Sequence, residues 1–155
     1  MRDIALPKSE TRRMSDQNIQ GTCLCGTVTY RITGRILSFQ YCHCSRCRKF
    51  TGSAHAANAF TALDGLEWVQ GEDSVGKFVL DASPKYGTAF CKNCGSSLPS
   101  VSSSAGVWVI PAGLLDEDIG ITPKRSIFWD SRAPWYRHVS DIPCYAEHRD
   151  HSVKE

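Results

Sequence analysis

Two cysteine-rich turns decide the fold: Cys23-Leu24-Cys25-Gly26 near the start of the chain and Cys91-Lys92-Asn93-Cys94-Gly95 in its middle. Structural zinc takes four ligands at the corners of a tetrahedron, with Zn–S bonds of ~2.3 Å. A tight turn brings two sulfurs onto one edge of that tetrahedron, and the glycine that follows permits a backbone conformation closed to other residues. Backbone amides of such turns can point at the thiolates and spread their charge. The two turns therefore predict one closed four-thiolate zinc site.

A third cluster, Cys42-His43-Cys44-Ser45-Arg46-Cys47, offers three thiolates at C-x-C-x-x-C spacing. Three protein ligands and an open position are typical of catalytic zinc. Zinc with three thiolates carries a charge of −1, which makes the metal a poor Lewis acid for water but able to hold and activate a thiolate. We therefore predict a second zinc on Cys42, Cys44 and Cys47, with its open position available to water or to an incoming thiol.

Two further residues are alternative ligands of this second site. His43 could be a fourth ligand, but it lies between two ligand positions and would point the other way on an extended chain. Cys144 could complete the site, although its neighbours Pro143 and Tyr145 favour a buried apolar thiol.

The length and composition indicate one globular domain without a membrane span. The chain has 155 residues, of which 41% are hydrophobic and 22% charged. No apolar run approaches the ~20 residues that span a bilayer, and the N-terminus lacks the apolar core of a secretory signal. Eight cysteines in such a chain favour metal binding in a reducing compartment, and we expect the cytoplasm. Disulfides are the alternative, but Cys23/Cys25 and Cys42/Cys44 are too close to pair readily with each other.

The net charge gives no indication of a nucleic-acid or membrane partner. The formal charge of +2 counts every cysteine as neutral, and seven thiolates with two Zn²⁺ would bring it near −1. Either value is too small to argue for nucleic-acid or membrane binding. A zinc-ribbon-like nucleic-acid surface would need clustered basic residues, and only Arg46 to Lys49 qualifies. We expect neither partner, and the sequence does not indicate an oligomeric state.

Several residues near the second cluster have both a functional and a structural interpretation. Arg46, Arg48 and Lys49 would be the solvated face of a short helix, or Arg46 and Arg48 would hold substrate carboxylates through their planar guanidinium groups. His55 would be a hydrogen-bonded structural histidine, or a proton shuttle that faces the substrate. The aromatic residues Trp129, Trp135 and Tyr136 are expected in the core or in a pocket wall.

The chain divides into a leader, a domain and a tail. Residues 1–19 are polar and without periodicity, so we expect a flexible N-terminal leader, in which Met14 is an alternative start. Residues 20–146 form the zinc-binding domain. Residues 147–155 form a polar C-terminal tail whose two histidines, His148 and His151, are expected in solvent.

Short apolar runs punctuated by glycines predict a mainly β domain with one short helix. The expected strands cover residues 27–32, 36–41, 56–60, 66–69, 77–80, 88–90 and 107–110. Within the first of them, Val28, Tyr30 and Ile32 share one face. The helix is expected from Ser45 to Thr51, with Ser45 as its cap and Gly52 at its end. We also expect a helical turn near residues 114–118 and a hairpin loop over residues 100–104.

These motifs, in this order, resemble the glutathione-dependent formaldehyde-activating (GFA) domain family. The matching stretches are Gly21 to Tyr30, Cys42 to Arg48, Phe90 to Gly95, Gly113 to Asp116, Ile127 to Trp129 and Ala133 to Trp135. The resemblance covers about residues 20–146. It implies a β-rich, Mss4-like fold of several small curled antiparallel sheets around the zinc sites. It also implies a structural zinc on Cys23, Cys25, Cys91 and Cys94 and a catalytic zinc on Cys42, Cys44 and Cys47.

The resemblance further implies an enzyme that adds glutathione to formaldehyde, giving S-hydroxymethylglutathione, and that is classed as a carbon–sulfur lyase. Glutathione would then be a co-substrate, with a small aldehyde as the second partner. The segment between Cys47 and Cys91 should shape the substrate pocket, and it carries no recognisable glutathione-binding signature. The alternative function is a non-catalytic zinc module that binds a small thiol or a protein partner.

Overall fold

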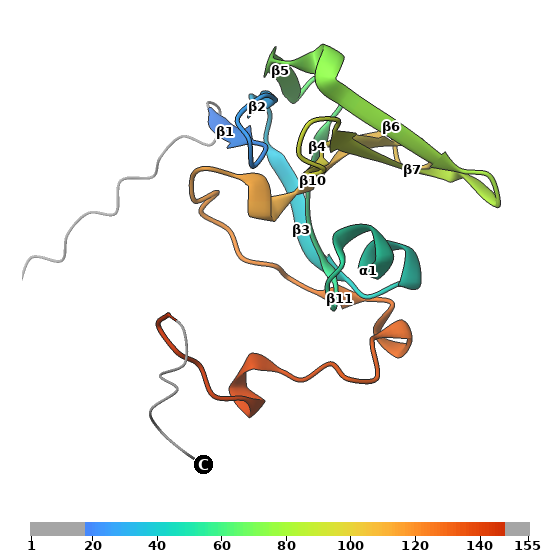
Figure 1. Ribbon diagram of the computed structural model, residues 1–155, viewed down its shortest axis with the longest axis vertical. Helices are drawn as coiled ribbons and strands as arrows, with labels where there is room; N and C mark the ends of the chain where they lie inside the picture. Colours follow the sequence, from blue (N-terminus) through green and yellow to red (C-terminus); the bar gives the residue numbers. More distant parts are fainter. Residues whose placement is uncertain (1–17, 148–155) are drawn as a thin grey trace, which may run out of the picture.

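The computed structural model describes residues 18–147 and contains three small sheets (Figure 1). Within each sheet, neighbouring strands are hydrogen-bonded in the following order. The first holds β1 (Ile19–Thr22), β2 (Thr29–Ile32) and β5 (Leu66–Gln70). The second holds β11 (Ser126–Ile127), β3 (Ile36–Cys42), β4 (Ala56–Ala62), β10 (Val107–Pro111) and β9 (Ser100–Ser102). The third holds β6 (Val75–Leu80), β7 (Ser83–Cys91) and β8 (Ser97–Leu98).

Helical structure is sparse in the described part of the chain. The α-helix α1 (Ser45–Thr51) follows β3. Four 3₁₀ turns, η1 (Glu72–Ser74), η2 (Ala112–Leu114), η3 (Trp129–Ser131) and η4 (Val139–Asp141), lie between or after the strands. The strands pair antiparallel except for β11 with β3, which is parallel. The predicted fold class, mainly β with several small antiparallel sheets and one short helix, is confirmed. None of the described helices is long and apolar enough to cross a membrane.

The first hairpin shows why the sequence folds this way beside the first cysteine pair. Val28, Tyr30 and Ile32 are fully buried on one face, as their alternation predicts. Tyr30 lies opposite Gly21 in the β1–β2 register. A Cβ atom on Gly21 would stand 2.3 Å from the Tyr30 ring, so only glycine leaves room for that ring. The pairing of a glycine with a cross-strand tyrosine therefore fixes this hairpin and the turn that carries Cys23 and Cys25.

The helix begins and ends where the sequence predicts, but its cap is different. The predicted cap, Ser45, is wrong: Cys44 is the N-cap, and its Sγ accepts a hydrogen bond from the backbone N–H of Cys47. A thiolate at this position satisfies the same backbone donor that a serine hydroxyl would satisfy. Gly52 ends the helix in the left-handed conformation, as expected.

Several other elements differ in position from the prediction. Strand β1, which begins at Ile19, was missed, because its four residues are too few to show a period. The predicted loop at residues 100–104 instead starts as strand β9, which pairs with β10, so the turn follows Ser102. The predicted helical turn at residues 114–118 lies earlier, at η2. Most of the expected leader and tail, including His148 and His151, lies outside the described residues.

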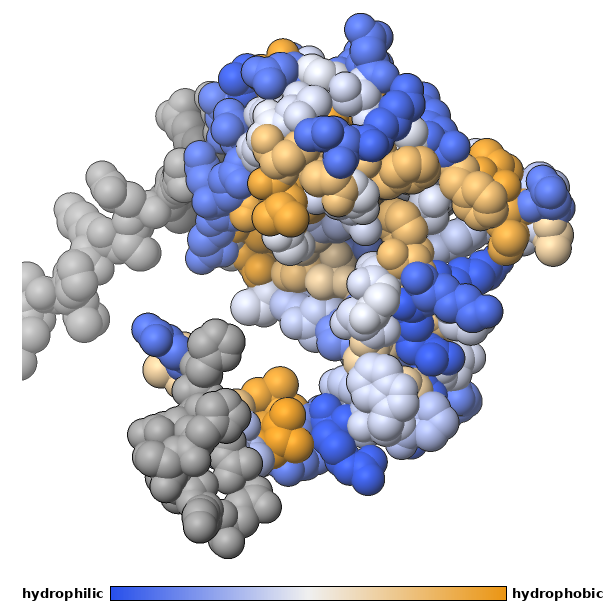
Figure 2. All heavy atoms as spheres, in the orientation of Figure 1, coloured by the Kyte–Doolittle hydropathy of each residue, from blue (hydrophilic) through white to orange (hydrophobic). Residues whose placement is uncertain are grey.

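The β6–β7 hairpin runs along the upper right of the molecule in Figure 1, and its residues Ser83 and Tyr86 contact Arg46 of α1. Its outer strand exposes two large apolar side chains, Phe78 and Val79, at 54% and 53%. Figure 2 shows the corresponding hydrophobic surface along this hairpin. The face of the hairpin that carries Tyr86 and Thr88 turns toward α1, and an open cavity lies between them.

Candidate functional site

The first cysteine pairs come together as the sequence predicts. The sulfurs of Cys23, Cys25, Cys91 and Cys94 all lie within 4.8 Å of one another. Cys23 Sγ is 3.5 Å from Cys25 Sγ, and Cys25 Sγ is 3.9 Å from Cys91 Sγ. A tetrahedron with Zn–S bonds of ~2.3 Å has edges of ~3.8 Å. The four sulfurs therefore fit one zinc ion without rearrangement of the chain.

The turns around this cluster supply donors to its sulfurs. The backbone N–H of Val28 donates to Cys23 Sγ at 3.2 Å, and the side-chain amide of Asn93 donates to Cys25 Sγ at 3.2 Å. Gly26 and Gly95 hold φ angles of +75° and +76°, which close the two turns. Such donors stabilise thiolates and support bound metal.

The thiol pKa values of this cluster diverge. Hydrogen bonds with Thr27 and then with Asn93 lower the pKa of Cys25 to about 5. Burial raises the pKa of Cys91 to about 11. A divalent metal ion replaces the proton of a buried thiol and stabilises the resulting thiolate. Such an ion would therefore stabilise Cys91 as a thiolate beside Cys25, whose pKa is already low. The chemistry of the donor set therefore agrees with its geometry.

The second cluster is assembled by one strand end and one helix start. Cys42 ends β3, Cys44 caps α1, and Cys47 lies in the first turn of that helix. Their three sulfurs also lie within 4.8 Å of one another. A hydrogen bond from Cys47 lowers the pKa of Cys42 to about 6, and the same pairing raises the pKa of the Cys47 thiol. Three sulfurs grouped this closely offer a three-ligand set for a metal.

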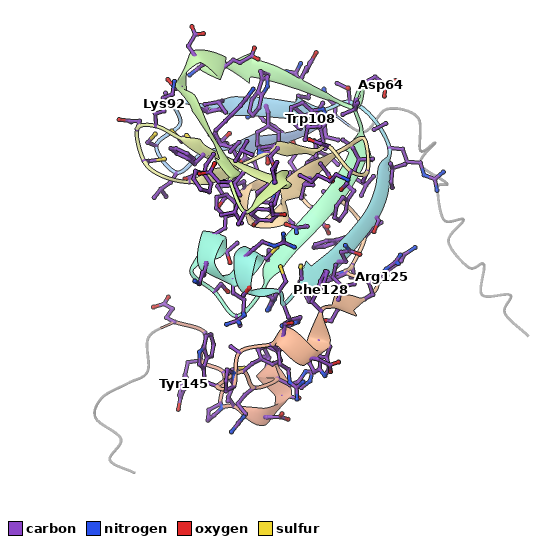
Figure 3. All side chains as sticks on the ribbon, turned by 90° about the vertical axis from the view of Figure 1, so that its right-hand side faces the viewer. Asp64, Lys92, Trp108, Arg125, Phe128 and Tyr145 are labelled. Carbon is purple, nitrogen blue, oxygen red and sulfur yellow. The ribbon has the colours of Figure 1, made fainter. Side chains whose placement is uncertain are left out.

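The two clusters lie in different parts of the molecule. Lys92, between the cysteines of the second turn, and Phe128, which follows the strand paired with Cys42, are well separated in Figure 3. All eight cysteines of the chain are among the described residues, and none forms a disulfide. Cys144 is exposed and belongs to neither group, so the expectation of a buried thiol there is wrong.

A cavity of 190 Å³ opens beside the second cluster, and Cys42 and Cys47 both line it. Its floor is one face of the second sheet, and its cover is formed by α1 and the β6–β7 hairpin. Its further lining residues include Gln40, Phe50, Ala56, Asn58, Phe60, Lys85, Tyr86, Leu98 and Val109. Many of them lie between Cys47 and Cys91, the segment expected to shape the pocket.

Tyr86 is the functional candidate that sequence reasoning missed. It lines the cavity with Cys47, and burial, together with the nearby Cys47 thiol, raises the pKa of its hydroxyl. No spacing links Tyr86 to the cysteines, because it is the fold that places the β6–β7 hairpin beside α1. A tyrosine that keeps its proton is a hydrogen-bond donor at the cavity wall.

A second cavity of 380 Å³ adjoins the first and carries the basic residues. Ser45, Arg46 and Lys49 of α1 face Tyr86 across it, and Phe50, Tyr86 and Thr88 line both cavities. The Arg46 guanidinium lies 4.9 Å from the centre of the Tyr86 ring and donates to Ser83 Oγ at 3.0 Å. Arg48 points elsewhere, where its Nε donates to the carbonyl of His43 at 3.2 Å. Arg46 and Lys49 therefore lie at the cavity, whereas Arg48 supports the cysteine loop.

His43 and His55 lie together on the opposite face of the second sheet. Their ring centres are 5.0 Å apart, and Tyr41 contacts His55 at 4.4 Å. Tyr41 and Cys42 are consecutive residues of β3, so their side chains point to opposite faces. Neither histidine is among the residues that line the cavity at Cys42 and Cys47.

The C-terminal segment covers this histidine pair. Trp129 and Tyr136 pack on the His43 ring at 5.0 and 5.2 Å, while Trp135 is 67% exposed, contrary to its expected place in the core or in a pocket wall. His43 is fully buried, and the backbone N–H of His43 donates to the carbonyl of Ile127 at 3.0 Å. Burial lowers the pKa of His43 and of His55. The segment thus supports the cysteine loop from behind.

Comparisons with known proteins show a family, a relative and a similar fold. The sequence profile of the family described as "Glutathione-dependent formaldehyde-activating enzyme" matches residues 18–131. A relative from Halomonas elongata, named "Putative glutathione-dependent formaldehyde-activating enzyme", is 29% identical over 146 residues, which cover 88% of this chain and 92% of the relative. A crystal structure of a Rhodobacter sphaeroides protein, 22% identical, superposes with a TM-score of 0.55 over 69% of this chain and 98% of that chain. The last likeness concerns the fold alone.

Proposed function

Since the chain belongs to the glutathione-dependent formaldehyde-activating (GFA) family, we propose that it joins a thiol, in the first place glutathione, to formaldehyde and cleaves the same adduct in reverse. In the forward direction the thiol loses its proton, and its sulfur forms a bond to the aldehyde carbon. The π electrons of the carbonyl group move to oxygen, which takes up a proton. The product is S-hydroxymethylglutathione, and the cleaving direction makes the protein a carbon–sulfur lyase.

One observation carries this proposal: Cys42 and Cys47, two of the three grouped thiols, line a cavity with room for substrate. Cys42, Cys44 and Cys47 would hold a zinc ion, and that ion would lower the pKa of an incoming thiol and favour its thiolate. Cys23, Cys25, Cys91 and Cys94 would hold the structural zinc. Free cysteines at both sites suit a reducing compartment such as the cytoplasm.

The chain's own residues position the two substrates. Arg46 and Lys49 in the adjoining cavity bind the carboxylates of the thiol and orient its sulfur toward Cys42 and Cys47. The Tyr86 hydroxyl, whose pKa is raised by burial, donates a hydrogen bond to the carbonyl oxygen as negative charge develops there. We assign this role to Tyr86 rather than to His55, because His55 contacts residues on the far face of the sheet.

Thiol-dependent loss of formaldehyde tests the proposal, with zinc content measured in the same samples. Wild type should accelerate the reaction over the uncatalysed rate, and Cys44→Ser should lose that acceleration together with one zinc per chain. Cys144→Ser, at an exposed cysteine outside both clusters, is the control and should keep both. A wild type that binds zinc but accelerates no thiol–aldehyde reaction would instead support a non-catalytic zinc module.

A further inference from the structure

The cavity beside the second cluster extends well beyond the cysteines. Cys42 pairs with Ala56 in the β3–β4 register, and Phe60, four residues further along β4, pairs with Val109 of β10. Residues of a strand rise ~3.3 Å each, so the floor runs roughly 13 Å from Cys42 to Phe60. Both ends of this floor line the same cavity.

The two directions away from the cysteines differ in chemistry. Toward α1 lie the cations Arg46 and Lys49, which suit the carboxylates of a thiol such as glutathione. Along the sheet lie the apolar side chains of Phe60, Leu98 and Val109, and Ser100, which pairs with Val109, also lines the cavity. A charged peptide-like thiol gains little against such walls, because burial of its polar groups without partners costs free energy. The apolar end therefore suits the aldehyde rather than the thiol.

Formaldehyde does not fill this end. A cavity needs only ~10–15 Å³ to hold one water molecule, and formaldehyde has only two non-hydrogen atoms. Most of the 190 Å³ therefore remains for other groups. Binding sites gain affinity when apolar walls meet an apolar ligand, so the empty length of the cavity would favour an aldehyde with a hydrocarbon substituent.

We propose that the site also accepts aldehydes that carry a short alkyl or phenyl group, which lies along the sheet between Leu98 and Val109 while the thiol lies toward Arg46. This proposal rests on the proposed function and extends it from formaldehyde to larger aldehydes. The chemical step is unchanged: sulfur bonds to the carbonyl carbon, oxygen takes up a proton, and the product is a hemithioacetal. No oxidant or reductant is required.

Unreactive thioethers test the binding part directly. S-methylglutathione and S-butylglutathione are compared by calorimetry on the zinc-loaded protein. A methylene group in a hydrophobic pocket changes selectivity by about 10–200-fold, so S-butylglutathione should bind at least about tenfold tighter. Val109→Phe should abolish that preference by filling the apolar end. Val107→Phe, two residues away on the same strand and outside the cavity lining, is the matched control and should keep it.

Kinetics with glutathione and either formaldehyde or butanal test the activity, each corrected for the uncatalysed reaction. Val109→Phe should lower kcat/KM for butanal by at least about tenfold and leave formaldehyde within about threefold. Val109→Ala, which enlarges the same end, should shift the preference toward longer aldehydes. It provides a second test if Val109→Phe does not fold. Equal binding of both thioethers, with formaldehyde activity intact, would overturn this inference alone. No binding of either thioether and no activity with formaldehyde would overturn both proposals.

Discussion

Replacement of Cys91 by serine should unfold the protein, whereas replacement of Cys44 should leave it folded. Cys91 is fully buried at the end of β7, where it joins the third sheet to the turn that carries Cys23 and Cys25. Structural zinc contributes ~10–16 kcal/mol in small zinc domains. A domain of this size is stable by only ~5–15 kcal/mol in total. Loss of the structural metal therefore removes about as much free energy as the fold has.

The second cluster has less effect on folding, because it is local. Cys42, Cys44 and Cys47 lie within six consecutive residues, and α1 is also held by its Gly52 cap and by the Thr51 hydroxyl, which donates to the Cys47 carbonyl at 2.9 Å. Loss of metal there frees a short loop rather than separating two sheets. Cys44→Ser should therefore keep a cooperative thermal transition, although it loses activity.

Circular dichroism melts and zinc analysis of both variants measure this asymmetry, with Cys144→Ser as the common control. The expected result is a normal melt for Cys44→Ser with one zinc per chain, and no cooperative melt for Cys91→Ser. A Cys91→Ser protein that melts within a few degrees of wild type would refute the reasoning, because the closed four-thiolate cluster would then contribute little to folding.

Three further perturbations follow from the site and the hairpin beside it. Tyr86→Phe should lower kcat by about 10²–10³-fold, the usual cost of one donor to a developing oxyanion, in steady-state assays, with zinc content unchanged. Gly21→Ala should lower the free energy of unfolding by about 1–3 kcal/mol through overpacking against the Tyr30 ring, as measured in urea. His55→Gln should lose less stability than wild type between about pH 7.5 and 5.5. Burial lowers the pKa of His55, so the unfolded chain takes up a proton first as the pH falls through ~6.5, and wild type loses stability there.

Each of these expectations has a contrary outcome. Unchanged kcat in Tyr86→Phe would remove the hydroxyl from the mechanism. If Gly21→Ala leaves the free energy of unfolding unchanged, the Tyr30 ring is free to move aside. If His55→Gln changes the pH profile of kcat and leaves the pH dependence of stability unaltered, His55 acts in proton transfer after all.

The sequence was sufficient to predict the two cysteine clusters, because the C-x-C and C-x-x-C spacings mark the turns that bring sulfurs together. The turns at Cys25-Gly26 and Cys94-Gly95 need no tertiary information to be recognised, and the three sulfurs of the second cluster lie on one strand end and one helical turn. The strand faces were also predictable where alternation is clear, as at Val28, Tyr30 and Ile32. These signals are local.

What the sequence did not disclose depends on contacts between distant segments. Tyr86 reaches the cavity only because the fold places the β6–β7 hairpin beside α1. His55 is close to Cys47 in sequence but lies behind the sheet, where Tyr136 of the C-terminal segment covers it. Phe128 has a φ of +54°, an unusual conformation for a large side chain, and no sequence pattern predicts it. Substrate residues are therefore harder to identify than metal ligands.

Native mass spectrometry of the protein, purified under reducing conditions, tests the central claim most directly. We predict two zinc ions per chain and all eight cysteines as free thiols or thiolates. A mild chelator should remove one ion first, from the three-thiolate site, and leave the other in a folded protein. A folded chain without metal, or one whose mass shows cysteines joined as disulfides, would contradict the account.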